Sequence, residues 1–170
     1  ELFHRSAPPG FEGSYGDFPG IKPHYTAVTT ETAEADARAA CEWLRANSQV
    51  DGEDISSIGF CMGGRVSFIA NSVLPLRAAV SFYGGGIATG LLDRAAKLHG
   101  PMLLVWGGLD KNITAEHRKA VADALAAAKK SYVSAEFSDA DHGFFCDERS
   151  SYNGRAAREA WALSLEFLRP

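Results

Sequence analysis

Three residues in this chain have side chains that could together perform nucleophilic catalysis. Cys61 stands between glycines in GFCMGG, Asp110 follows the apolar run PMLLVWGGL, and His142 lies in DADHGFF. A thiol can act as nucleophile, an imidazole can move its proton, and a carboxylate can orient the imidazole. Nucleophile, then acid, then base is one of the chain orders in which such triads occur. We therefore interpret these residues as a candidate triad.

The cysteine lies in a sequence pattern that is typical of a sharp turn between a strand and a helix. Gly59 and Gly63 stand two residues before and after Cys61, where the backbones of strand and helix come too close for side chains. Such a turn presents the sulfur at a helix N-terminus, which favours the thiolate. The amide of Met62 would then donate to an oxyanion. The alternative is that Cys61 is a small buried apolar residue.

The other two residues also have ordinary alternatives. His142 could be a surface histidine, and Asp110 could cap a helix that begins near Thr114. Cys146 stands four residues after His142 and could pair with it as a metal ligand, but no third or fourth ligand is placed to complete a site. A redox pair of Cys61 and Cys146 lacks the C-x-x-C spacing. We expect no metal and no cofactor.

Composition narrows the class of protein. The chain has 170 residues, of which 46% are hydrophobic and 22% charged, with a formal net charge of -4. Because the basic residues are scattered, we expect neither a nucleic acid nor a membrane surface as partner. Three widely spaced cysteines are an odd number, which fits free thiols in a reducing compartment. This predicts a cytoplasmic protein.

The opening segment, residues 1–28, shows neither the apolar spacing of a helix nor that of a strand, so it is predicted to be irregular. Helix and strand patterns alternate along the rest of the chain. A helix of roughly 16 residues should follow a Thr29 cap. In the closing helix, Ala157, Trp161, Leu165 and Leu168 lie on one stripe. Strands are predicted at 54–60, 77–84, 101–108 and 132–138, with helices at 61–74, 89–98, 114–130 and 152–168.

This alternation predicts an α/β fold with a mostly parallel sheet and helices on both faces. All of residues 1–170 would belong to a single domain. In such folds the chemistry lies at the carboxyl ends of the strands. The three candidate residues each follow a different predicted strand, which favours the triad over a coincidence of composition.

Four segments resemble the dienelactone hydrolase (carboxymethylenebutenolidase) family of α/β hydrolases, whose nucleophile is a cysteine. They are GFCMGG, GGLD, DHGFF and SYNGRAAREAW. The resemblance implies hydrolysis of a small ester or lactone through a thioester acyl-enzyme, without a cofactor. It matches Cys61 to the nucleophile, Asp110 to the acid and His142 to the base. It also places Arg5, in ELFHRSAPPG, at a position that binds the substrate carboxylate.

Two departures from the family pattern qualify this expectation. Family members have further strands before this point, together with a glutamate near the cysteine and a loop that donates the second oxyanion amide. We therefore expect the C-terminal two-thirds of the fold, with the strand at 54–60 covered by a missing N-terminal segment or a second copy. Cys146 replaces the second carboxylate-binding arginine, which argues against the anionic dienelactone as substrate. The alternative is an inactive ligand-binding remnant or proteolytic fragment.

Overall fold

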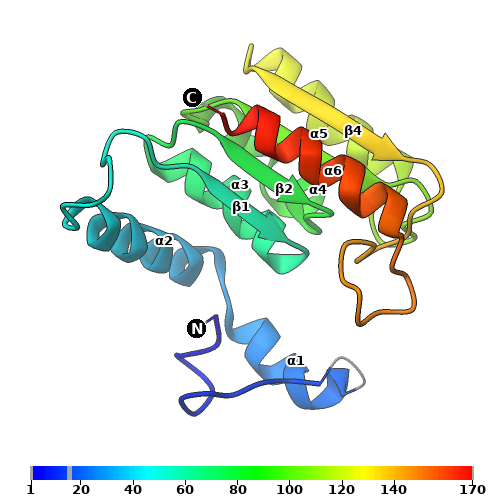
Figure 1. The fold of residues 1–170 in the computed structure, drawn as a ribbon, viewed down its shortest axis with the longest axis horizontal. Helices are drawn as coiled ribbons and strands as arrows, with labels where there is room; N and C mark the ends of the chain where they lie inside the picture. Colours follow the sequence, from blue (N-terminus) through cyan, green and yellow to red (C-terminus); the bar gives the residue numbers. More distant parts are fainter. Residues whose placement is uncertain (1, 15–16, 170) are drawn as a thin grey trace.

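The computed structural model describes residues 2–14 and 17–169 and is built on a four-stranded parallel sheet (Figure 1). The strands lie in the order in which they occur in the sequence, and each pairs with the next in parallel. All four fall within the predicted ranges, and the predicted parallel sheet is confirmed. They are β1 (Ser57–Phe60), β2 (Ala79–Phe82), β3 (Met102–Gly107) and β4 (Tyr132–Phe137).

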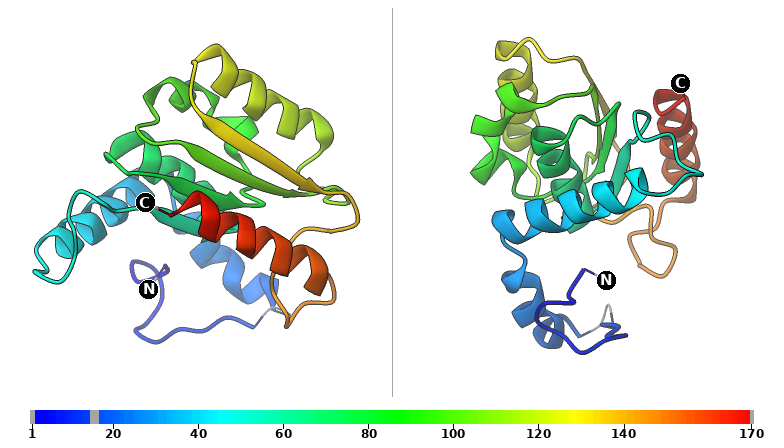
Figure 2. Two further views of the ribbon diagram at one scale, coloured as in Figure 1. Left: turned by 45° about the horizontal axis from the view of Figure 1, so that its top comes forward. Right: turned by 90° about the vertical axis from the view of Figure 1, so that its left-hand side faces the viewer.

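Helices cover both faces of the sheet, as expected (Figure 2). The helix α6 (Gly154–Phe167) lies on one face. The other face carries α3 (Met62–Val73), α4 (Ile87–Gly90), the 3-10 helix η1 (Leu92–Lys97) and α5 (Ala115–Ala127). The helix α2 (Thr30–Arg45) has the predicted 16 residues and packs against α3. The Thr29 hydroxyl caps it by accepting from the Thr32 amide.

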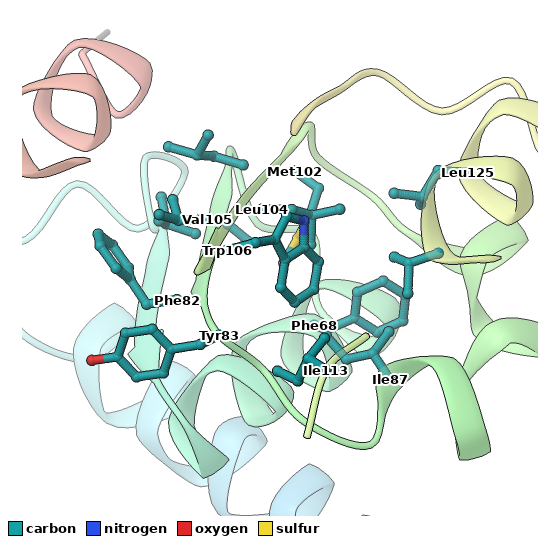
Figure 3. Close-up of a cluster of buried hydrophobic side chains, with 14 of the residues drawn as sticks. Phe68, Phe82, Tyr83, Ile87, Met102, Leu104, Val105, Trp106, Ile113 and Leu125 are labelled. Atoms are coloured by element: carbon teal, nitrogen blue, oxygen red, sulfur yellow. The ribbon is translucent and has the colours of Figure 1, made fainter. Parts of the chain in front are cut away.

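The core lies between the central strands and the helices. Every residue of β3 is buried, because helices cover this strand on both faces. Trp106 of β3, Phe82 of β2 and Phe68 of α3 are among the largest fully buried side chains (Figure 3). This packing fixes the carboxyl ends of β2 and β3 beside the start of α3, where the candidate residues lie.

The opening segment is not irregular throughout, which corrects the prediction for residues 1–28. A helix, α1 (Phe18–Ala27), begins after Asp17, whose side chain accepts a hydrogen bond from the Gly20 amide. It contains Pro23, and none of its residues is buried. A helix without a buried face has no apolar periodicity, so the sequence pattern did not show it.

Two further predictions need correction. The helix predicted at 89–98 is two short pieces, α4 and η1, which meet at Leu91. In α6, the stripe proposed from the sequence is only partly buried, since Trp161 is 41% and Leu165 is 52% exposed. The face that packs on the sheet is made of smaller residues, namely Ala156, Ala157, Ala160 and Ser164.

One edge of the sheet is open among the described residues. Strand β1 pairs only with β2, and its residues Ile58 and Phe60 are 37% and 36% exposed. An apolar groove of about 260 Å³ lies along this edge between β1, α2 and α3. The predicted unpaired edge is therefore present. Within the described part of the chain, no helix combines the length and apolar character needed to cross a membrane.

The close approach of β1 to α3 depends on Gly59. A Cβ atom at Gly59 would overlap the carbonyl group of Gly63, whereas a Cβ at Gly63 would meet nothing within 4 Å. The predicted need for glycine is therefore confirmed at position 59 and wrong at position 63, where the space beside the helix is open. We expect Gly59→Ala to lower the free energy of unfolding by about 2 kcal/mol or more, because backbone atoms must move.

The matched control is Gly63→Ala, which should leave that free energy within about 1 kcal/mol of the parent value or raise it. Urea denaturation followed by circular dichroism measures both. Equal stability of the two variants would contradict the prediction.

Candidate active site

Cys61 occupies a sharp turn between β1 and α3. Its backbone has φ 54° and ψ −117°, a conformation that is strained for a residue other than glycine. The Cys61 amide donates to the Phe82 carbonyl at 3.0 Å, which ties the turn to the end of β2. The strained turn places the sulfur at the start of α3, beside the amide of Met62. This is the geometry of a nucleophile elbow.

The structure brings the three predicted residues into one line of contacts. His142 Nε2 lies 3.2 Å from Cys61 Sγ, and His142 Nδ1 lies 2.7 Å from Asp110 Oδ2. The three residues come from the ends of β1, β3 and β4, which are far apart in sequence. Their meeting at one edge follows from the parallel sheet.

Asp110 is held by backbone amides in the loop after β3. It is 5% exposed, and its Oδ1 accepts from the Asn112 amide at 2.8 Å and the Ile113 amide at 3.1 Å. The helix cap that the sequence offered as an alternative role belongs to Thr114, whose hydroxyl accepts from the His117 amide. Asp110 therefore presents its second oxygen to His142 in a fixed direction.

The loop that carries His142 is tied at two points. The His142 amide donates to Asp141 Oδ1 at 2.6 Å, and the Ser151 hydroxyl donates to the His142 carbonyl at 2.8 Å. The ring of Tyr83 packs on the imidazole with centroids 5.1 Å apart. These contacts limit the positions that the imidazole can take between Cys61 and Asp110.

The charges in this row of residues support one another. Burial opposes ionisation of Cys61, but the hydrogen bond and charge of His142, the Met62 amide and the charge of Arg149 outweigh it and lower the thiol pKa. Burial also disfavours the imidazolium, yet the hydrogen bonds to Asp110 and Cys61 raise the His142 pKa to about 9. The pKa of Asp110 is lowered because contacts with His142 outweigh its burial. At neutral pH this favours a thiolate beside an imidazolium.

Cys61 opens into a cavity of about 380 Å³. Most of its wall is apolar or aromatic, and it includes residues of α1 that the sequence analysis did not single out. The only signal for them was the high aromatic content of the opening segment. The lining residues are Phe18, Ile21, Tyr25, Phe60, Cys61, Tyr83, Gly143, Phe145, Cys146 and Arg149.

Tyr83 is a further residue that sequence reasoning missed. It follows β2 with φ 37°, lines the cavity, and is 3% exposed. Figure 3 shows its hydroxyl pointing away from Phe68 and Trp106. Burial, together with the neighbouring thiols of Cys61 and Cys146, raises the pKa of Tyr83, so the hydroxyl stays protonated.

Arg5 does not lie where the resemblance placed it. Its guanidinium pairs with Asp36 of α2, and Arg5 is not among the residues that line the cavity. The expected carboxylate-binding role is therefore not supported by its position. The arginine that does line the cavity is Arg149. Within the described ranges, no group of three or more His, Cys, Asp or Glu side chains could hold a metal ion.

The fold and this site define the class: an α/β hydrolase. The family model for the dienelactone hydrolase family matches residues 16–170. The chain therefore belongs to the dienelactone hydrolase family.

Individual relatives support this family assignment. A Synechocystis protein assigned to the carboxymethylenebutenolidases is 32% identical, over 94% of this chain and 68% of its own length. An Escherichia coli K12 protein of the same assignment is 28% identical over 93% of this chain and 62% of its own. The chain thus spans about two thirds of the length of these relatives.

Solved structures support the same family assignment. A Klebsiella pneumoniae protein assigned as a dienelactone hydrolase superposes with a TM-score of 0.87 and 27% identity. The superposition covers 99% of this chain and 72% of that one. A dienelactone hydrolase-like promiscuous phosphotriesterase from metagenomic libraries has a TM-score of 0.76 and 25% identity, covering 88% of this chain and 65% of its own.

The lowered pKa of Cys61 predicts a reactive thiol. Iodoacetamide should alkylate Cys61 at pH 7 faster than an ordinary cysteine, and the rate should fall only below the lowered pKa, where the thiolate is lost. In His142→Gln the thiol pKa should rise, and the rate at pH 7 should drop by at least about tenfold.

Peptide mass spectrometry against pH measures these rates residue by residue. Because Cys41 is buried, added glutathione serves as the reference for an ordinary, accessible thiol. A Cys61 rate that does not differ between the parent and His142→Gln would contradict the prediction.

Proposed function

We propose that the protein hydrolyses small ester or lactone substrates through Cys61, His142 and Asp110. The observation that carries this proposal is the unbroken row of contacts from the Cys61 sulfur through both imidazole nitrogens to the buried Asp110 carboxylate. Membership of the dienelactone hydrolase family supports a hydrolase. The substrate would occupy the cavity into which Cys61 opens.

The proposed reaction begins with attack of the Cys61 thiolate on the carbonyl carbon. The electrons of the carbonyl bond move to its oxygen, and the resulting oxyanion accepts a hydrogen bond from the Met62 amide. When the tetrahedral intermediate collapses, the bond to the alcohol oxygen breaks, and His142 gives that oxygen its proton. The products of this half-reaction are an alcohol and a thioester on Cys61.

Water completes the cycle. Neutral His142 takes a proton from water, the hydroxide attacks the thioester carbonyl, and the thiolate leaves as the carboxylic acid forms. Asp110 stabilises the imidazolium in both halves and holds Nε2 toward the reacting atoms. No oxidant, reductant or cofactor enters this balance. A nucleophilic thiol must stay reduced, so we also propose that the protein works in the cytoplasm.

Cys61→Ala should reduce kcat/KM for small esters and lactones by at least about a thousandfold, because the nucleophile is lost. Turnover of a panel of acetate esters and five- and six-membered lactones measures this loss. Intact mass spectrometry of the parent after rapid quenching should show the acyl group on Cys61.

Cys146→Ser is the matched control, because it removes a second thiol from the same cavity wall while leaving the nucleophile in place. Unchanged turnover in Cys61→Ala would refute the proposed mechanism. An absence of turnover in the parent, together with a Cys61 thiol that reacts no faster than free cysteine, would favour the inactive-remnant alternative.

We also propose that another strand covers the open edge of β1 in the working protein. This strand would come from a segment outside residues 1–170 or from a second copy of the chain. The support is the exposure of Ile58 and Phe60 and the apolar groove along the same edge.

Amide hydrogen exchange of β1 separates the two sources. Protection that grows with protein concentration would indicate a second copy. Rapid exchange at every concentration would exclude a second copy and leave a segment outside residues 1–170 as the proposed source of the strand. Full protection of the β1 amides at low concentration would contradict an open edge.

A further inference from the structure

The cavity beside Cys61 has an aromatic wall drawn from four separate segments. Phe18 and Tyr25 come from α1, Phe60 ends β1, Tyr83 follows β2, and Phe145 lies in the loop after His142. Figure 2 shows that α1 and this loop lie at the same end of the molecule. Aromatic side chains from segments so far apart in sequence surround one space only because the tertiary structure brings them together.

The rings form two groups. On α1, Phe18 and Tyr25 pack edge to face with centroids 6.1 Å apart. On the body of the fold, Phe60 and Phe145 lie 4.9 Å apart, and Phe60 also contacts Tyr83 at 6.4 Å. Tyr83 in turn packs on the His142 imidazole. The aromatic surface on the body of the fold therefore continues to His142, and the α1 pair lines the same cavity.

The aromatic rings on α1 leave apolar surface exposed. Phe18 is 54% and Tyr25 is 37% exposed, although both line the cavity, and no residue of α1 is buried. Exposed aromatic surface that lines a cavity gains free energy when a flat apolar group covers it. A cavity of about 380 Å³ is also within the range that holds a ligand larger than a simple acetate ester.

We propose that the preferred substrates are esters or lactones that carry an aromatic ring, bound between the Phe18–Tyr25 pair and the Phe60–Phe145 pair. The reacting carbonyl would then lie at Cys61, where the wall ends. This inference rests on the proposed hydrolase function and names the substrate class of the same site. Phe18 and Tyr25 would be specificity-determining residues, since they contact the ring and not the reacting atoms.

Two pairs of uncharged esters test the proposal. Benzyl acetate and cyclohexylmethyl acetate both release a primary alcohol, so the ring is the main difference between them. Methyl phenylacetate and methyl cyclohexylacetate place the same contrast in the acyl part. Since no member is charged, attraction to Arg149 cancels within each pair. We expect the aromatic member to have at least about tenfold higher kcat/KM in one pair or both.

Substitutions on α1 test where the ring binds. Phe18→Leu and Tyr25→Leu should each lower the aromatic-to-saturated ratio by about threefold or more, because one ring contact is lost. If α1 were only structural, both members of a pair would slow equally and the ratio would not change. Trp43→Leu is the control, since Trp43 is 68% exposed on α2 outside the cavity and the ratio should stay as in the parent.

The two proposals can fail separately. A ratio near one in both pairs, with Cys61→Ala inactive, would overturn the aromatic site and leave the hydrolase intact. A ratio above tenfold that neither α1 variant changes would overturn the assignment to Phe18 and Tyr25. If Cys61→Ala kept its turnover, the proposed mechanism would fail. The affinities of that variant for benzyl alcohol and cyclohexylmethanol, measured by calorimetry, would still test the aromatic site. Equal affinities would overturn the aromatic site.

Discussion

The contact between the backbones of β1 and α3 is the constraint on which the site depends. Gly59 lets strand β1 lie against the Gly63 carbonyl of α3, and Cys61 at the apex of the turn takes a positive φ. The hydrogen bond from the Cys61 amide to Phe82 joins this turn to the neighbouring strand. If strand and helix were held further apart, the turn at Cys61 would open and the sulfur would no longer lie within 3.2 Å of His142 Nε2. The position of the Cys61 side chain therefore depends on the backbone geometry of this turn.

The electrostatics follow from that geometry. Burial alone would keep both the thiol and the imidazole neutral, since each charged form loses hydration. Ionisation of the pair is nevertheless favoured, because each partner stabilises the charge of the other and because Asp110, held by two loop amides, accepts a hydrogen bond from the imidazole. The lowered thiol pKa and the raised imidazole pKa therefore both depend on the contacts among these three residues.

The opening segment contributes differently. None of the residues of α1 is buried, yet this helix supplies part of the wall of the cavity at Cys61. Arg5, in the same segment, is engaged with α2 instead of the cavity. The segment that the sequence pattern described least well therefore contributes three residues, Phe18, Ile21 and Tyr25, to the wall of the cavity at Cys61.

Much of the fold could be predicted from the sequence. Residues that pack against the sheet must be apolar, so apolar residues recur with the spacing of a strand or of a helix in each element that contacts it. The sequence by itself determined the four strands, the elbow around Cys61, and the order of Cys61, Asp110 and His142. It failed for α1, which has no buried face, and for α6, where small alanines and not Trp161 or Leu165 face the sheet. The tertiary structure alone decided the 3.2 Å and 2.7 Å contacts of His142. It also decided that Arg5 pairs with Asp36 of α2 and that aromatic rings from four segments line the cavity. Those features join residues from distant segments, and only packing in three dimensions sets the distances between them.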